Sequence, residues 1–189
     1  MKINGNAIRP GMVIEHQNRL WRAVKIQHTQ PGKGGAYLQV ELKDLRSGTK
    51  LNERFRSSVS VERAHLDQRD YQYLFADGDI YTFMDTESYE QIAMGKDLLG
   101  EDQIPYLQES MIVKVESHED DPIGVQLPDT VILEIVEADA VVKGQTASSS
   151  FKPALLENGI KTLVPPHIES GTRVVINTAD GSYVERAKD

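Results

Sequence analysis

The sequence contains no cysteine. This absence excludes disulfide frameworks, thiolate zinc sites and cysteine nucleophiles, and it is typical of a reducing compartment. No two histidines stand at the i, i+4 spacing that places both imidazoles on one helix face. They occur singly, as His16, His28, His65, His118 and His167. We therefore expect neither a metal site nor a bound cofactor.

Long apolar runs are missing as well. The sequence has no stretch of about 20 consecutive apolar residues, the length that a membrane-spanning helix requires. Its first residues, MKINGNAIRPGMVIEHQ, lack the apolar segment of about 7 to 15 residues found in a signal peptide. We expect a cytoplasmic protein with no membrane partner.

Basic residues are fewer than acidic ones, 21 against 29, so the net charge is -8. Such a charge by itself argues against a nucleic-acid partner. The distribution is uneven, however: the net charge is +7 over residues 1–64, -12 over 65–127 and -3 over 128–189. A basic head on an acidic body is typical of a protein that touches a polyanion with one end. For the middle segment alone, a solvated acidic surface is the better interpretation.

Long helical patterns are nearly absent, whereas short runs of β-branched and aromatic residues recur between turn signals. This pattern is typical of small β-barrels, and it predicts a mainly β protein. The predicted strands lie at 12–15, 20–26, 37–42, 50–56, 71–75, 80–84, 111–116, 123–127, 131–136, 154–159, 162–166, 173–177 and 183–186. Short helices are predicted at 86–93 and 103–108.

These elements divide into three barrels: a basic SH3-like barrel at 1–64, an acidic OB-fold at 65–128 and a C-terminal OB-fold at 129–189. A barrel of about 60 residues buries only about 60% of its unfolded surface, so each core is marginal by itself. We expect neighbouring barrels to pack on one another in an elongated rod or an L.

A glycine-rich loop, Pro31-Gly32-Lys33-Gly34-Gly35, joins two strands of the predicted basic barrel. Glycines relieve the steric limits on φ and leave the loop tip without bulky neighbours, so Lys33 should project freely. On residue types alone, an ordinary hairpin loop with a solubilising lysine is the favoured interpretation.

A phosphate-binding loop is excluded by spacing. The pattern G-x-x-x-x-G-K-[ST] ending at Lys33 requires glycine at position 27 and serine or threonine at position 34, but the chain has Gln27 and Gly34. Hydrolysis of a nucleoside triphosphate is therefore not expected.

Several short motifs occur together in the chain in a fixed order. They are Pro31-Gly-Lys-Gly, Arg46-Ser-Gly-Thr, Tyr73-Leu-Phe-Ala-Asp-Gly, Phe83-Met-Asp, Leu133-Glu-Ile-Val, Val141-Val-Lys-Gly, Lys152-Pro-Ala and Gly181-Ser-Tyr-Val-Glu-Arg. In this combination the chain resembles the bacterial elongation factor P family over its whole length. The resemblance implies an SH3-like barrel followed by two OB-folds, in an L that imitates transfer RNA.

The resemblance also implies a function and its partners. Family members bind the 70S ribosome between the P and E sites and relieve stalling on consecutive prolines. Lys33 would then lie beside the CCA end of peptidyl-tRNA in the P site, while the ribosome supplies the catalysis. A lysine at this position is often lengthened by a modifying enzyme, so we expect such a modification of Lys33 in a monomeric, non-enzymatic protein.

Two further sets of residues match family positions. Gly144, Gln145 and Thr146 match a loop that family members aim at the E-site codon, although Gln145 stands where the family has aspartate. Tyr183 and Arg186 match positions that face a small-subunit protein, but a tyrosine and an exposed arginine at a strand end are common in any small barrel.

Two other classes of protein were weighed against this interpretation. A module that binds single-stranded RNA needs exposed aromatics beside basic residues. The aromatics of the second segment lie in acidic surroundings, which favours core packing: Tyr71, Tyr73, Phe75, Tyr81 and Phe83. For an enzyme, the only carboxylate cluster is at a predicted hairpin tip, where we expect solvated charge without a catalytic role: Glu116, Glu119, Asp120 and Asp121.

Overall fold

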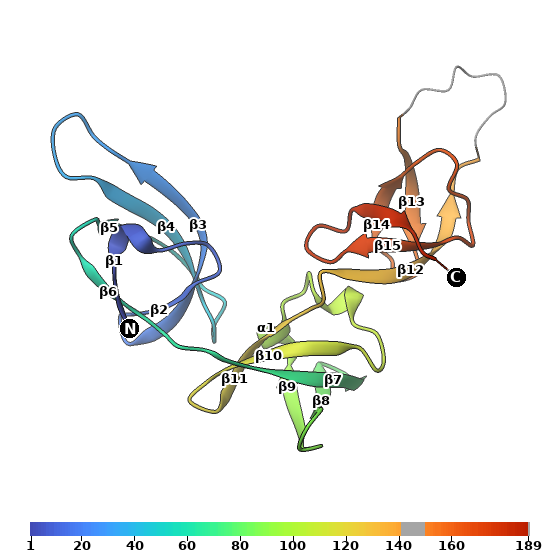
Figure 1. Cartoon of the computed structure of the whole chain (residues 1–189), viewed down its shortest axis with the longest axis horizontal. Helices are drawn as coiled ribbons and strands as arrows, with labels where there is room; N and C mark the ends of the chain where they lie inside the picture. The colour runs from blue at the N-terminus through green and yellow to red at the C-terminus, as the bar shows by residue number, and fades with distance from the viewer. Residues whose placement is uncertain (141–149, 189) are drawn as a thin grey trace.

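The computed structural model describes residues 1–140 and 150–188, which form three antiparallel sheets in sequence order. The sheets follow one another in a bent, L-like array, with the first and third on either side of the second (Figure 1). The prediction of a mainly β protein made of three small β units is confirmed. In the described residues, no helix reaches the length and apolar character that a membrane-spanning helix needs.

The first sheet has the strand order β1-β6-β2-β3-β4-β5. Its elements are β1 (Lys2–Asn4), the 3-10 helix η1 (Gly5–Ala7), β2 (Val13–His16), β3 (Arg19–Thr29), β4 (Tyr37–Asp44), β5 (Lys50–Arg56) and β6 (Ser60–Arg63). Alternate residues of β4 are fully buried: Leu38, Val40 and Leu42. With Trp21 they form the core of this barrel. The sequence did not predict β1 and β6. Both strands are short, and they pair with each other although they lie at opposite ends of the first barrel in the sequence.

The second sheet has the order β11-β10-β7-β8-β9. Its elements are β7 (Asp67–Asp77), β8 (Ile80–Asp85), β9 (Gln91–Gly95), the helix α1 (Lys96–Leu99), the 3-10 helix η2 (Ile104–Tyr106), β10 (Ile112–His118) and β11 (Asp121–Gln126). The predicted helix at 103–108 is reduced to η2.

The predicted helix at 86–93 is wrong. Residues 86–90 form a hairpin turn, and β9 begins at Gln91. The Asp85 carboxylate accepts the N–H groups of Glu87 and Ser88, and Tyr89 adopts a positive φ of 61°. These local hydrogen bonds offer the backbone an alternative to helix, which explains why the helix prediction failed.

A β-bulge in β7 makes the prediction of core packing wrong for Phe75. The register with β8 shifts between Tyr73 and Phe75, so that Tyr73 pairs with Phe83 but Phe75 pairs with Thr82. Tyr73 is consequently buried, while Phe75 is 52% exposed. Tyr81 and Phe83 lie in the core as predicted.

The third sheet has the order β14-β13-β12-β15-β16. Its described strands are β12 (Thr130–Ala138), β13 (Lys152–Leu156), β14 (Lys161–Val164), β15 (Arg173–Asn177) and β16 (Tyr183–Arg186). Thr162 faces the interior of this barrel, where an aliphatic residue would be expected. Its hydroxyl donates to the Gly181 carbonyl at 2.7 Å, which satisfies the buried polar group.

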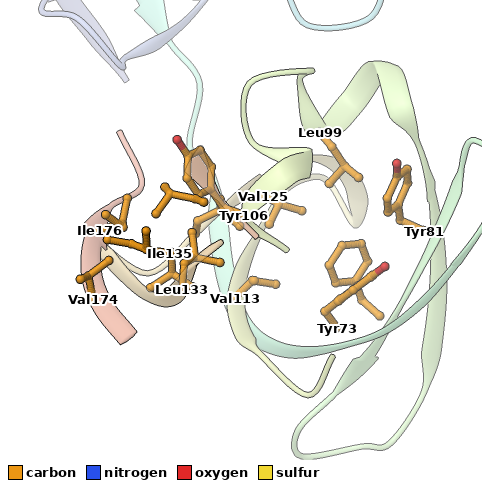
Figure 2. Close-up of a cluster of buried hydrophobic side chains, with 14 of the residues drawn as sticks. Tyr73, Tyr81, Leu99, Tyr106, Val113, Val125, Leu133, Ile135, Val174 and Ile176 are labelled. Atoms are coloured by element: carbon orange, nitrogen blue, oxygen red, sulfur yellow. The ribbon is translucent and has the colours of Figure 1, made fainter. Parts of the chain in front are cut away.

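The second and third sheets share one continuous hydrophobic core. Tyr106 of η2 lies between the side chains of the two sheets and is 5% exposed (Figure 2). Polar contacts cross the same junction: Asn158 donates to the Pro105 carbonyl at 3.2 Å, and Gln108 donates to the Ile132 carbonyl at 2.9 Å. The first barrel has a separate core cluster among the described residues.

Candidate functional site at the β3–β4 loop

The glycine-rich loop joins β3 to β4 at the tip of the long hairpin of the first barrel, as the sequence predicts. The last residue pair of the hairpin is Thr29 and Tyr37. Figure 1 shows the hairpin reaching beyond the rest of its barrel, at the end of the molecule farthest from the third sheet. Lys33 is exposed at this tip.

The glycines of the loop leave open space beside the lysine. A Cβ atom added at Gly32 or Gly35 would meet no atom within 4 Å. Gly34 has a φ of +119°, a conformation that a residue with a side chain adopts only under strain. The backbone at the tip is thus sterically uncrowded, and Lys33 has room to carry a longer side chain.

The base of the loop is held by contacts that sequence reasoning missed. The Arg54 guanidinium carbon lies 4.3 Å from the ring centroid of Tyr37, the first residue of β4. The Ser57 N–H donates to the Ala36 carbonyl at 3.1 Å, and Leu38 next to them is fully buried. A cation over an aromatic ring stabilises this arrangement. An exposed tip therefore stands on a well-packed base.

Positive charge is concentrated at the loop end of the hairpin. Arg54 and Arg56 on β5 pair with Gln39 and Tyr37 of β4, and both arginines are exposed. With Lys33 they form a group of three exposed cations among the described residues of the hairpin. The chemistry that this surface can perform is the binding of an anion, such as a phosphate backbone.

The other predicted site residues do not join this loop. Tyr183 and Arg186 lie on β16 of the third sheet, at the other end of the array (Figure 1). Tyr183 is half-buried, with its ring edge-on to Phe151 at 6.4 Å, and Arg186 is exposed. Gly144, Gln145 and Thr146 lie outside the described residues.

The acidic cluster of the second barrel is not one solvated set. Glu119 and Asp120 form the tip of the β10–β11 hairpin with φ values of 50° and 66°, as predicted. Glu116 is different, because it is 8% exposed and its Oε2 atom accepts from Arg22 Nη2 at 3.1 Å. The prediction of solvated charge was therefore wrong for Glu116, whose partner is 94 residues away in sequence.

Three family models match consecutive parts of the chain. The elongation factor P KOW-like domain matches residues 4–61, the elongation factor P OB domain residues 66–125, and the elongation factor P C-terminal domain residues 131–186. These matches agree with the predicted SH3-like barrel and following OB-fold. Their limits also follow the three sheets.

Full-length relatives are similar over the whole chain. Elongation factor P of Zymomonas mobilis is 62% identical over 187 residues, which is 99% of this chain and 100% of that protein. Elongation factor P of Rhizorhabdus wittichii is 60% identical over the same share of both chains. A solved structure, eukaryotic translation initiation factor 5A from Methanococcus jannaschii, aligns with a TM-score of 0.49 and 22% identity over 65% of this chain and 91% of that one. On the family models and the full-length relatives together, the chain belongs to the elongation factor P family.

Proposed function

We propose that the chain is a translation elongation factor that binds the 70S ribosome between the P and E sites. There it stimulates peptide-bond formation on stalled sequences of consecutive prolines. The observation that carries the proposal is the position of Lys33, exposed at the tip of a firmly based hairpin on a barrel of net charge +7 over residues 1–64. Family membership supports the same role.

The proposed mechanism is positioning. Lys33 contacts the phosphates near the CCA end of peptidyl-tRNA in the P site and holds the nascent chain in a productive geometry. Ordering two reactants contributes several kcal/mol without any acid, base or nucleophile from the factor, up to about 7 to 11 kcal/mol in favourable cases. Proline is a constrained reactant and gains most from such ordering. The factor itself is therefore not an enzyme in this proposal.

A lysine-modifying enzyme is the second proposed partner. The open space beside Gly32 and Gly35 allows Lys33 to carry an added cationic group, which would reach farther toward RNA phosphates. Intact-mass measurement of the protein from its native host tests this proposal. A mass equal to that of the bare sequence would refute it.

The remaining assignments are also proposals. Gly144, Gln145 and Thr146 contact the E-site codon, and Tyr183 and Arg186 contact a small-subunit protein. We also propose that the protein acts as a monomer in the cytoplasm. Its three barrels are proposed to span residues 1–64, 65–128 and 129–189. The separation of Lys33 from β16 along the array supports contacts with different parts of one large partner (Figure 1).

Translation of a reporter with three consecutive prolines tests the main proposal. The unaltered protein should raise reporter yield, Lys33→Ala should lose most of that stimulation, and a reporter without prolines should not respond. Lys161→Ala is the control, because Lys161 is also an exposed lysine but lies on β14 of the third sheet, away from the loop. Equal stimulation by the Lys33→Ala variant would show that the loop lysine does not carry the function.

A further inference from the structure

The two junctions between neighbouring barrels are built differently. The second and third barrels are joined by a continuous hydrophobic core. Between the first and second barrels lies an open cleft of about 910 Å³. Five buried apolar residues lie on its walls: Val13, Ala64, Leu99, Ile123 and Val125. Leu99 and Val125 belong to the core of the second and third barrels and the other three to neither core cluster, so neither cluster of the described residues crosses this junction. Hydrophobic packing alone therefore fixes the first barrel much less firmly than the third.

The covalent connection between these two barrels is short. β6 ends at Arg63 and β7 begins at Asp67. Ala64 is still tied to the first barrel, because its N–H donates to the Val13 carbonyl at 3.0 Å. Rotation of one barrel against the other is then concentrated at His65 and Leu66, and His65 is 89% exposed. Domains joined in this way move relative to each other unless an interface holds them.

Arg22 bridges the cleft. Its Nη2 atom donates to Glu116 Oε2 of the second barrel at 3.1 Å, and its Nη1 atom donates to the Gly11 carbonyl of the first barrel at 3.2 Å. The Glu116 side chain is 10% exposed and that of Arg22 31%. The planar guanidinium holds both acceptors at once, which a lysine ammonium on a flexible stem does less well. Arg22 lies on β3, the strand that leads directly into the Lys33 loop.

The second barrel leaves space for this guanidinium. Glu116 pairs with Gly124 across β10 and β11. A Cβ atom at Gly124 would lie 3.6 Å from Arg22 Nη2 and 4.0 Å from the Leu98 carbonyl oxygen. A larger side chain here would extend into the volume that the guanidinium occupies. The part of the cleft formed by the second barrel thus fits the Arg22 side chain closely.

Other ion pairs between the two barrels are weaker. Arg46 and Asp121 lie 3.4 Å apart, but their side chains are 84% and 62% exposed. The His118 and Glu15 side chains form a longer contact, with His118 Nε2 and Glu15 Oε1 4.0 Å apart. Exposed ion pairs contribute little to stability because water and salt screen them. Removing one partner of a largely buried pair costs more, because it leaves the other charge buried and unpaired.

We propose that Arg22 and Glu116 are positioning residues that fix the angle between the first barrel and the joined second and third barrels. In doing so they set the direction in which the β3–β4 loop presents Lys33. The consequence for Lys33 rests on the proposed function, whereas the angle is a property of the free protein.

Pulsed electron–electron double resonance on the free full-length chain tests this proposal. The chain has no cysteine, so pairs of spin labels can be placed at introduced cysteines alone. Ser58→Cys with Lys161→Cys reports the distance between the first and third barrels, and Glu87→Cys with Lys161→Cys reports the second and third; all three positions are exposed. The variants are Arg22→Ala and Glu116→Gln, and the matched control is Arg46→Ala, which removes the exposed pair.

We expect Arg22→Ala to broaden the Ser58–Lys161 distance distribution by about twofold or more, since released domains move by default. Glu116→Gln, which keeps the shape of the side chain, should broaden it less, and Arg46→Ala not at all. The Glu87–Lys161 distribution should stay unchanged in every variant. If both Arg22→Ala and Glu116→Gln leave the first distribution narrow, or if Arg46→Ala broadens it equally, the buried pair does not set the angle. The reporter assay has no influence on these outcomes, so failure of either proposal is recognised separately.

Discussion

At Gly5 the chain passes so close to β5 that only a hydrogen atom fits as side chain. A Cβ atom there would lie 2.5 Å from the Arg56 carbonyl oxygen and 3.0 Å from Phe55 Cβ. Both neighbours are fixed, because Phe55 is buried in the core and Arg56 pairs with Tyr37 across the sheet. A single missing methyl group thus allows η1 to pack directly against β5.

We expect Gly5→Ala to lower the free energy of unfolding by about 1 to 3 kcal/mol, since overpacking forces the backbone to shift. Urea unfolding followed by the fluorescence of Trp21, which lies in the same core, measures this change. Gly35→Ala is the control, because its Cβ would meet no atom within 4 Å and an exposed substitution should change stability by no more than about 0.5 kcal/mol. Equal effects of the two substitutions would contradict the close approach at Gly5.

At the scale of elements, two hairpins use the same turn. Asp44 ends β4 and Asp85 ends β8, and each carboxylate accepts two backbone N–H groups from the following residues. Each aspartate also has an arginine nearby, Arg19 at 3.2 Å and Arg69 at 3.8 Å. Both carboxylates lie among side chains that bury them. The turn chemistry in this way ends one strand and starts the next in two different barrels.

The charge state of Asp44 should make stability depend on pH. Burial raises the pKa of Asp44. The N–H groups of Arg46 and Ser47 and the Arg19 guanidinium together lower it by more than burial raises it, so the pKa lies below the ordinary 3.8. Because the folded pKa is depressed, the stabilisation is fully present above about pH 4 and is lost as the pH falls through the folded pKa.

The measurement is the free energy of unfolding from neutral pH down to about pH 2 for the unaltered protein and for Asp44→Asn. We expect the variant to be less stable at neutral pH and the difference to shrink in acid. Asp120→Asn, at an exposed hairpin tip, should show no such convergence. A difference that stays constant with pH would show that the carboxylate charge at Asp44 does not contribute.

At the scale of the whole molecule, the described residues form two separate hydrophobic cores. One is the core of the first barrel, which includes Leu42. The other is the common core of the second and third barrels, which includes Ile135 and Tyr106 (Figure 2). The net charges of +7 over residues 1–64 and -12 over 65–127 follow nearly the same division. The part proposed to approach RNA is therefore basic and has a core cluster of its own among the described residues.

Cavity-forming substitutions in the two cores should reduce amide protection in different sets of sheets. Ile135→Ala should cost about 2 to 5 kcal/mol, as is usual for buried aliphatic residues, and should reduce amide protection in both the second and third sheets. Leu42→Ala is the matched substitution, since both residues are fully buried, and it should reduce protection only within β1 to β6. Hydrogen exchange read by mass spectrometry distinguishes the two patterns. Loss of protection confined to the third sheet in Ile135→Ala would contradict the shared core.

Predictions from the sequence succeeded where the cause is local. The Gln17-Asn18 turn adopts φ values of 52° and 59°, and Gly181 turns β15 into β16, because such turns depend on the few residues that form them. The strand predicted at 37–42 likewise lies within β4. The Lys33 loop was found in the same way, from its glycines and flanking strands.

Predictions failed where distant residues decide. β1 was not predicted because it depends on pairing with β6, far along the chain. The predicted helix at 86–93 failed for a local reason instead, because the hydrogen bonds of Asp85 form a turn that aligns β9 with β8. Phe75 points outward because of a bulge that depends on pairing with β8. Glu116 was predicted to be solvated, but its side chain is largely buried beside Arg22, a residue from another barrel.

The sequence by itself determined the β character of this protein, its three units, the basic charge of the first unit and the exposed Lys33 loop. Those properties follow from composition, periodicity and turn chemistry over a few residues. Only the tertiary structure decided that the second and third barrels share a core and that Arg22 and Glu116 hold the first barrel to them. The physical reason is that burial and ion pairing arise between residues far apart in the chain, and neither leaves a pattern in the residues next to them.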